Sequence, residues 1–140
     1  MKGILQRYFS LYRPLVNKLN ELLGEYGLSH SLWQVILYIK QNGPSSLVDI
    51  ANHYNIEKPS ITRRVFALQE KSLVDTVPGK DRREKIIHLT ETGEKLYEEC
   101  RRSITELEYK LMEDITEAEQ VTLFETLPKI QDKLTKEKGL

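Results

Sequence analysis

The feature that most constrains this sequence is a short helical segment in its middle, followed by a tight turn and a second helix. Ser46 and Asp49 have the spacing of a capping box, which opens a helix with its apolar residues on one side. Residues 55–58 separate it from a second helix that begins near Pro59, a residue well suited to a first helical turn. This order is the outline of a helix-turn-helix.

The helix over residues 59–71 has two chemically different sides. One side carries three apolar residues, Ile61, Val65 and Leu68. The opposite side carries Pro59, Thr62, Arg63 and Phe66, with Ser60 on a flank. We expect the first side to pack and the second to be free. Short polar side chains and an arginine on a free face can reach base edges in the major groove of DNA, although a solvated helix would show the same pattern.

A β-hairpin with a charged tip follows this helix. Residues 73–77 and 85–90 supply its two arms, and Pro78, Gly79, Lys80 and Asp81 supply turn residues. The tip, residues 80–85, holds four basic and two acidic side chains. Asp81 precedes Arg83 by two residues and can hold that guanidinium in a fixed orientation, which suits insertion into a narrow minor groove. A solvated turn would also look like this.

Two helices are expected before this region. Residues 4–23 show the spacing of an amphipathic helix with a wide aromatic stripe, and Pro14 should kink it or mark where its regular part begins. The next helix can be capped by Ser29 or by Ser31, and the Ser31 to Gln34 spacing fits a capping box.

Two further helices are expected after the hairpin. Thr90 can cap a long helix, and Thr116 with Glu119 forms another capping box before a last helix that contains Pro128. The fold class is therefore mainly α with a small β-wing, in the order of four helices, a hairpin and two helices. The apolar stripes of the terminal helices are too broad for this chain to cover alone, and a second copy could cover them.

Charge is unevenly distributed along a chain whose formal charge is zero. Residues 58–90 carry eight Lys or Arg against four Asp or Glu, whereas residues 91–140 carry eight against thirteen. The basic segment coincides with the second helix of the helix-turn-helix and the hairpin. A nucleic-acid partner is therefore compatible with the overall neutrality.

Composition excludes several classes of protein. The 140 residues suffice for one domain, and no stretch approaches the roughly 18 apolar residues of a membrane span, so we expect a cytoplasmic protein with no membrane partner. The lone Cys100 excludes an internal disulfide and cysteine-based zinc sites. His30, His53 and His88 have no ligand-like spacing, so we expect no metal and no cofactor. We also expect no enzyme, because the chain lacks a phosphate-binding glycine loop and a nucleophile elbow.

Three motifs make the chain resemble the MarR family of winged helix-turn-helix transcription regulators over essentially its whole length. They are Leu28-Ser29 with Trp33-Gln34-Val35-Ile36-Leu37, Lys58-Pro59-Ser60-Ile61-Thr62-Arg63, and Asp81-Arg82-Arg83 with Leu89-Thr90-Glu91-Thr92-Gly93. The resemblance implies one MarR-type domain over residues 1–140, with a DNA-binding lobe at 29–90 and dimerisation helices at 1–27 and 91–140. It also implies a homodimer on a pseudo-palindromic site of double-stranded DNA, acting as a ligand-responsive repressor.

The resemblance also assigns site residues. We expect the following to bind DNA: Lys58, Pro59, Ser60, Thr62, Arg63, Arg64, Lys80, Asp81, Arg82 and Arg83. Members of the family commonly bind small aromatic or phenolic effectors between the dimer helices and the DNA-binding lobe. We assign four residues to that crevice, Tyr8, Tyr12, Arg13 and Trp33.

The chain departs from the family pattern at several positions. Glu57 replaces a helix-capping serine and would repel a phosphate unless it turns back to its own helix. Phe66 stands where polar or basic residues are common, and Ser72 replaces a glycine before the wing. Two alternatives stay open: an interaction module of the same fold without DNA binding, and a redox-sensing regulator that uses Cys100, a residue we expect to be buried.

Overall fold

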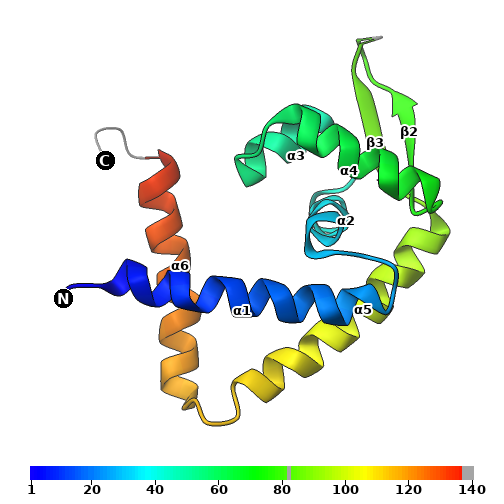
Figure 1. The fold of residues 1–140 in the computed structure, drawn as a ribbon. Helices are drawn as coiled ribbons and strands as arrows, with labels where there is room; N and C mark the ends of the chain where they lie inside the picture. Colours follow the sequence, from blue (N-terminus) through cyan, green and yellow to red (C-terminus); the bar gives the residue numbers. More distant parts are fainter. Residues whose placement is uncertain (82, 137–140) are drawn as a thin grey trace. The chain divides into compact units, whose positions relative to one another are not determined.

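The computed structural model describes residues 1–81 and 83–136, and its elements follow the expected order (Figure 1). The elements are α1 (Ile4–Gly24), α2 (His30–Asn42), β1 (Ser45–Ser46), α3 (Leu47–Tyr54), α4 (Lys58–Glu70), β2 (Val74–Pro78), β3 (Lys85–Leu89), α5 (Glu91–Leu111) and α6 (Glu117–Lys136). The prediction of a mainly helical fold with a small β-wing is confirmed. None of the described helices is both long enough and apolar enough to cross a membrane.

The chain forms two compact units, residues 1–104 and residues 105–140. In the first unit, one apolar core joins the helix-turn-helix to the wing. Its fully buried side chains include Ile36 of α2, Ile50 of α3, Ile61 and Leu68 of α4, and Ile87 of β3. Burying side chains of this size contributes about 1.5–3 kcal/mol each, so this core sets the angle at which α4 is held.

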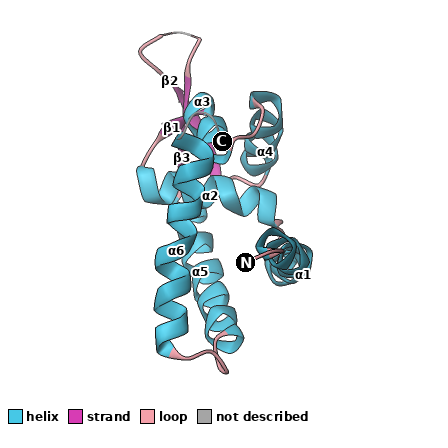
Figure 2. Cartoon of the chain, turned by 90° about the vertical axis from the view of Figure 1, so that its left-hand side faces the viewer, coloured by secondary structure: helices cyan, strands magenta, loops and turns pink. Residues whose placement is uncertain are grey.

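The sheet has three antiparallel strands in the order β1-β3-β2, and the wing loop extends beyond α3 (Figure 2). In the hairpin, Val74 pairs with Leu89 and Pro78 pairs with Lys85. The strand β1 was not predicted, because two residues are too few to show an alternating pattern. It pairs with β3 and leads directly into α3.

All four predicted helix caps form, and one predicted capping box is wrong. Ser46 and Asp49 form the expected capping box at α3, and Thr116 and Glu119 form the same reciprocal bonds before α6. The hydroxyl of Thr90 accepts the backbone N–H of Gly93 in the first turn of α5. The cap of α2 is Ser29, whose hydroxyl accepts the N–H of Leu32, so the capping box predicted from Ser31 is not formed.

The junction between the wing and α5 is tightly packed. Gly93 is buried, and a Cβ atom built on it would lie 2.1 Å from the carbonyl oxygen of Leu73. The same carbonyl accepts the N–H of Thr90 over 3.1 Å. Ser72, just before the wing, has φ 61°, a left-handed conformation that favours glycine. Ser72, which replaces the glycine usual in the family, therefore lies at a position where glycine would be less strained.

Helices α1 and α6 each continue through a proline and carry exposed apolar side chains. Pro14 lies inside α1 and Pro128 lies inside α6. On α1 the exposed large apolar residues are Ile4, Leu5, Tyr8, Phe9, Leu11 and Tyr12. On α6 they are Val121, Leu123, Phe124, Leu127, Ile130 and Leu134. Each helix thus carries six exposed large apolar side chains.

Candidate nucleic-acid interface

The two sides of α4 separate as the sequence predicts. Ile61, Val65 and Leu68 are buried in the core, whereas Thr62 and Arg63 are exposed. Phe66 is 60% exposed on the same side. The free side of α4 therefore presents polar, basic and aromatic groups together on one rigid helix.

A chain of hydrogen bonds joins three side chains at the start of α4. Nη2 of Arg63 donates to Oγ of Ser60 over 3.1 Å, and the hydroxyl of Ser60 donates to Oε1 of Glu57, also over 3.1 Å. Glu57 makes no side-chain bond to the backbone of the helix, although it occupies the N-cap position. One carboxylate oxygen of Glu57 thus accepts from a side chain of its own helix, and the residue stays exposed.

Arg64 takes a different direction from the other basic residues of α4. Its Nη1 donates to the carbonyl of Ser31 over 3.3 Å and to Oε1 of Gln34 over 3.0 Å. Sequence reasoning grouped Arg64 with the DNA-contacting residues because its charge is visible in the sequence and its direction is not. The structure instead places the guanidinium between α4 and α2, where it fixes the two helices to each other.

Tyr54 reinforces the same joint from α3. Its hydroxyl donates to the carbonyl of Gln34 over 2.6 Å. Burial raises the pKa of Tyr54 to about 12, so the hydroxyl remains a donor at neutral pH. Burial, followed by the charge of Arg64, lowers the pKa of His30. These bonds hold α2, α3 and α4 as one body.

The described residues of the wing tip form hydrogen bonds within their own turn. The backbone N–H of Arg83 donates to Oδ1 of Asp81 over 3.2 Å, and the N–H of Gly79 donates to the carbonyl of Glu84 over 2.8 Å. The prediction that Asp81 would hold the guanidinium of Arg83 is therefore corrected, because its bond is to the backbone. Arg82, also predicted to bind DNA, lies outside the described residues.

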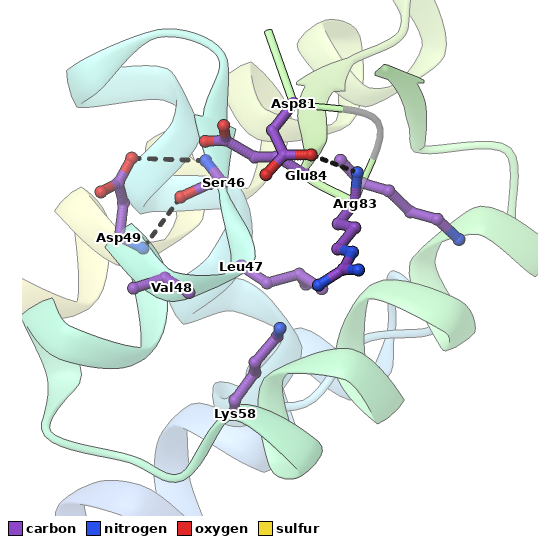
Figure 3. Close-up of a pocket in the computed structure, with 9 residues that line it drawn as sticks. Ser46, Leu47, Val48, Asp49, Lys58, Asp81, Arg83 and Glu84 are labelled. Atoms are coloured by element: carbon purple, nitrogen blue, oxygen red, sulfur yellow. Dashed lines mark hydrogen bonds between the residues drawn. The ribbon is translucent and has the colours of Figure 1, made fainter. Parts of the chain in front are cut away.

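An open pocket of about 330 Å³ lies between the wing, the start of α3 and the start of α4 (Figure 3). Its charged lining consists of Lys58, Arg83, Lys85, Asp49, Asp81 and Glu84. Two of the acids already accept backbone N–H groups, Asp49 from Ser46 and Asp81 from Arg83. Lys58 and Arg83 extend toward the same space from different elements (Figure 3).

Sequence reasoning included Lys85 in the wing but did not connect the start of α3 with this site. The capping box at Ser46 does indicate from the sequence that a helix starts there. The sequence does not indicate that β1 pairs with β3, and this pairing brings the helix start against the wing. The predicted residues Lys58, Asp81 and Arg83 line one pocket, and Lys80 is exposed at the same wing tip.

The four residues assigned to an effector crevice are only partly brought together. The rings of Tyr8 and Tyr12 lie 6.0 Å apart on α1, and the Arg13 guanidinium lies 5.7 Å from the Tyr12 ring centroid. Trp33 is 4% exposed and stacks on Tyr97 with ring centroids 5.4 Å apart. The indole thus lies in the core of residues 1–104, whereas Tyr8 and Tyr12 are exposed, and the effector crevice stays a prediction.

Cys100 is fully buried in the core, as expected. Burial, with a smaller contribution from Glu99, raises the pKa of this thiol to about 11. Because the thiolate is the reactive form, Cys100 is an unreactive packing residue in this structure.

Comparison with known proteins gives two kinds of likeness in sequence. A family model described as a winged helix DNA-binding domain matches residues 28–93. The HTH-type transcriptional regulator YwoH of Bacillus subtilis is 33% identical over 108 residues, which cover 77% of this chain and 79% of YwoH. The HTH-type transcriptional regulator FarR of Neisseria gonorrhoeae is 31% identical over 140 residues, which cover 94% of this chain and 90% of FarR.

Solved structures of similar fold extend over nearly all of the chain. The transcriptional regulator BldR from Sulfolobus solfataricus is 26% identical, with a TM-score of 0.84 and 94% of each chain covered. Staphylococcus aureus MarR, in complex with salicylate and kanamycin, is 24% identical, with a TM-score of 0.85 and coverage of 98% of this chain and 96% of that one. A mutant MarR from E. coli complexed with operator DNA is 21% identical, with a TM-score of 0.82 and coverage of 92% and 94%. The last two likenesses show the fold.

Proposed function

The chain belongs to the MarR family of winged helix-turn-helix transcriptional regulators, and on that premise we propose that it is a ligand-responsive repressor that binds a pseudo-palindromic operator as a homodimer. The observation that carries the proposal is the position of the free side of α4. This side belongs to the one segment of the chain, residues 58–90, in which basic residues outnumber acidic ones two to one.

In this proposal α4 enters the major groove and the wing enters the adjacent minor groove. Ser60, Thr62 and Arg63 face base edges from the free side of α4. Lys80, Arg82 and Arg83 of the wing approach the minor groove, where a narrow A·T-rich segment attracts arginine. Asp81 orders the turn that carries them.

Lys58 and Pro59, at the start of α4, contact the DNA backbone in this proposal. Lys58 shares the pocket beneath the wing with Arg83 and Lys85, and a phosphate of the DNA strand that separates the two grooves would be attracted to these three cations. Arg64 has a positioning role, since its bonds to α2 fix the angle of α4. Its contribution to DNA affinity is therefore indirect.

The second subunit covers the apolar side chains of α1 and α6. Tyr8 and Phe9 of α1 are 50% and 67% exposed, and Phe124 of α6 is 81% exposed. Burying side chains of this kind stabilises a protein by about 1.5–3 kcal/mol each. Two-fold symmetry also matches a pseudo-palindromic site, in which two half-sites lie about one helical turn apart.

A small aromatic or phenolic molecule is the proposed effector. Tyr8, Tyr12 and Arg13 supply aromatic faces and a cation on α1, which suit an aromatic carboxylate. Salicylate, present in the structure of S. aureus MarR, is such a molecule. Binding between the dimer helices and the DNA-binding lobe would change the separation of the two α4 helices and so weaken DNA binding.

The decisive experiment is selection of DNA sites by the purified protein from a randomised duplex library, followed by sedimentation of the free and bound protein. We expect one pseudo-palindromic sequence, a dimer at micromolar concentration, and a steep loss of affinity between 50 and 200 mM salt, as displacement of counterions from several phosphates requires. Binding without sequence preference, or a monomer, would refute the proposal. A thermal-shift screen of salicylate and related phenols tests the effector separately.

A further inference from the structure

The hydrogen-bonded chain at the start of α4 fixes which groups are left to face a partner. The hydroxyl of Ser60 has one proton and two lone pairs. Its proton is donated to Glu57 and one lone pair accepts from Arg63, both over 3.1 Å. Ser60 therefore has only an acceptor site left.

The groups on either side of Ser60 have opposite hydrogen-bonding character. The carboxylate of Glu57 can only accept, and it is exposed at the N-cap of α4. The guanidinium of Arg63 can only donate, and it is exposed one turn further along the same helix. The first turn of α4 thus presents an acceptor edge, Glu57 with Ser60, next to a donor edge, Arg63.

This pattern fits a cytosine beside a guanine in the major groove. Guanine presents two acceptors there, O6 and N7, which pair with arginine. Cytosine presents the N4 amino donor, which pairs with a carboxylate. We propose that Glu57 is a specificity-determining residue, which together with Ser60 selects the N4 amino group of a cytosine beside a guanine read by Arg63. This proposal rests on the proposed DNA-binding function.

Glu57 can affect DNA binding in two ways that an experiment can separate, through its negative charge and through its contact with a base. A negative charge beside the DNA backbone weakens binding to every sequence by a similar factor, because phosphate attraction does not depend on sequence. Acceptance of an amino proton, by contrast, favours one base at one position. Removal of the carboxylate should therefore raise affinity for unrelated DNA while preference for cytosine is lost at a single position.

The test compares site selection by the parent protein with that by Glu57→Ala and Glu57→Gln, using the randomised library. Glu70→Gln is the matched control, because it removes a carboxylate from the exposed far end of the same helix. We expect Glu57→Ala to reduce the preference for cytosine at one position by about tenfold, within the range of a good base contact. Glu57→Gln should admit adenine there, because an amide both donates and accepts. Glu70→Gln should leave every base preference unchanged.

A second measurement changes the DNA, so the parent protein alone already gives a result. In the selected site, the cytosine is replaced by N4-methylcytosine, whose methyl group takes the place of the major-groove N–H. The parent protein should lose about tenfold in affinity for this duplex, whereas Glu57→Ala should bind both duplexes equally. Ser60→Ala removes the hydroxyl that bonds to Glu57 and Arg63, and it should reduce the same cytosine preference.

Each outcome decides the matter. Unchanged base preferences in Glu57→Ala, or equal effects of Glu57→Ala and Glu70→Gln on all sequences, would overturn the role of Glu57 while leaving DNA binding intact. A parent protein that selects no sequence at all would refute the proposed function itself, and the specificity role with it.

Discussion

Replacement of Gly93 by alanine tests whether the close contact between α5 and the wing governs the stability of the DNA-binding lobe. In an exposed helix interior this change stabilises a protein by about 1 kcal/mol, because glycine is the poorer helix former. At Gly93 the added Cβ would lie 2.1 Å from the carbonyl oxygen of Leu73, where real Cβ contacts stay beyond 3.0 Å. Two backbone segments must therefore separate by roughly 1 Å.

The expected magnitude follows from three contributions. Overpacking of a buried site costs about 1–3 kcal/mol. Displacement of the Leu73 carbonyl also weakens its bond to the N–H of Thr90, which costs about 0.5–1.5 kcal/mol. After subtraction of the helix-forming gain, we expect Gly93→Ala to lower the free energy of unfolding by about 2 kcal/mol. For a chain of this size that loss lowers Tm by about 8 °C.

Chemical and thermal unfolding, followed by circular dichroism at one fixed protein concentration, measure this effect. The concentration must match because dimer stability depends on it. Gly24→Ala is the control, since Gly24 ends α1 with no heavy atom within 4 Å of an added Cβ, and it should be neutral or slightly stabilising. If both variants gained stability, the contact at Leu73 would not be limiting and the reasoning would be wrong.

Other predictions concern DNA binding, backbone strain and thiol chemistry. Arg63→Ala should cost about 1–3 kcal/mol of binding free energy and relax sequence preference, as measured by fluorescence anisotropy on selected and altered sites, and parental affinity would refute its base contact. Arg83→Ala should weaken binding most for sites with A·T-rich flanks, and an equal loss on G·C-rich flanks would exclude minor-groove insertion. Ser72→Gly should raise the free energy of unfolding by about 0.5–1 kcal/mol because φ is 61° there, and a loss of stability in urea would show that this conformation is not strained. Cys100, with its pKa raised to about 11, should resist iodoacetamide at pH 8 in the folded protein, and the free energy of unfolding should fall as pH rises from 9 toward 11, because only the unfolded thiol ionises in that window. Rapid alkylation detected by mass spectrometry without unfolding would contradict its burial.

Sequence patterns predicted the long elements well, because their signals are repeated many times along the chain. The buried side of α4 follows from three apolar residues at helical spacing, and all three are buried. The capping box at Ser46 is a local signal, and it forms as predicted. The pairing of β1 with β3 joins residues more than 35 positions apart. Two serines are too few to show the alternating pattern from which a strand is predicted.

The direction of long side chains accounts for most of the remaining errors. Gln34 was expected to cap its own helix and Arg64 was expected to bind DNA, yet the two side chains bond to each other across two helices. The capping box predicted from Ser31 does not form, because Ser29 is the N-cap and Ser31 already lies inside α2. Asp81 bonds to the backbone N–H of Arg83, because that donor is fixed by the turn whereas the guanidinium is free to move. Charge and spacing identify the surface, and packing decides which side chains point to it.

The strand β1 also determines where this protein can change in length. Ser45 and Ser46 pair with Ile87 and Ile86, and α3 begins at the next residue, so no spare chain lies between strand and helix. One extra residue before Ser46 would shift the pairing and turn buried side chains outward. The hairpin tip, by contrast, is closed by its own bond from Gly79 to Glu84, and residues added there lengthen the finger while its base stays anchored. Evolution or an engineer can therefore adjust how far the finger reaches without disturbing the helix at its side.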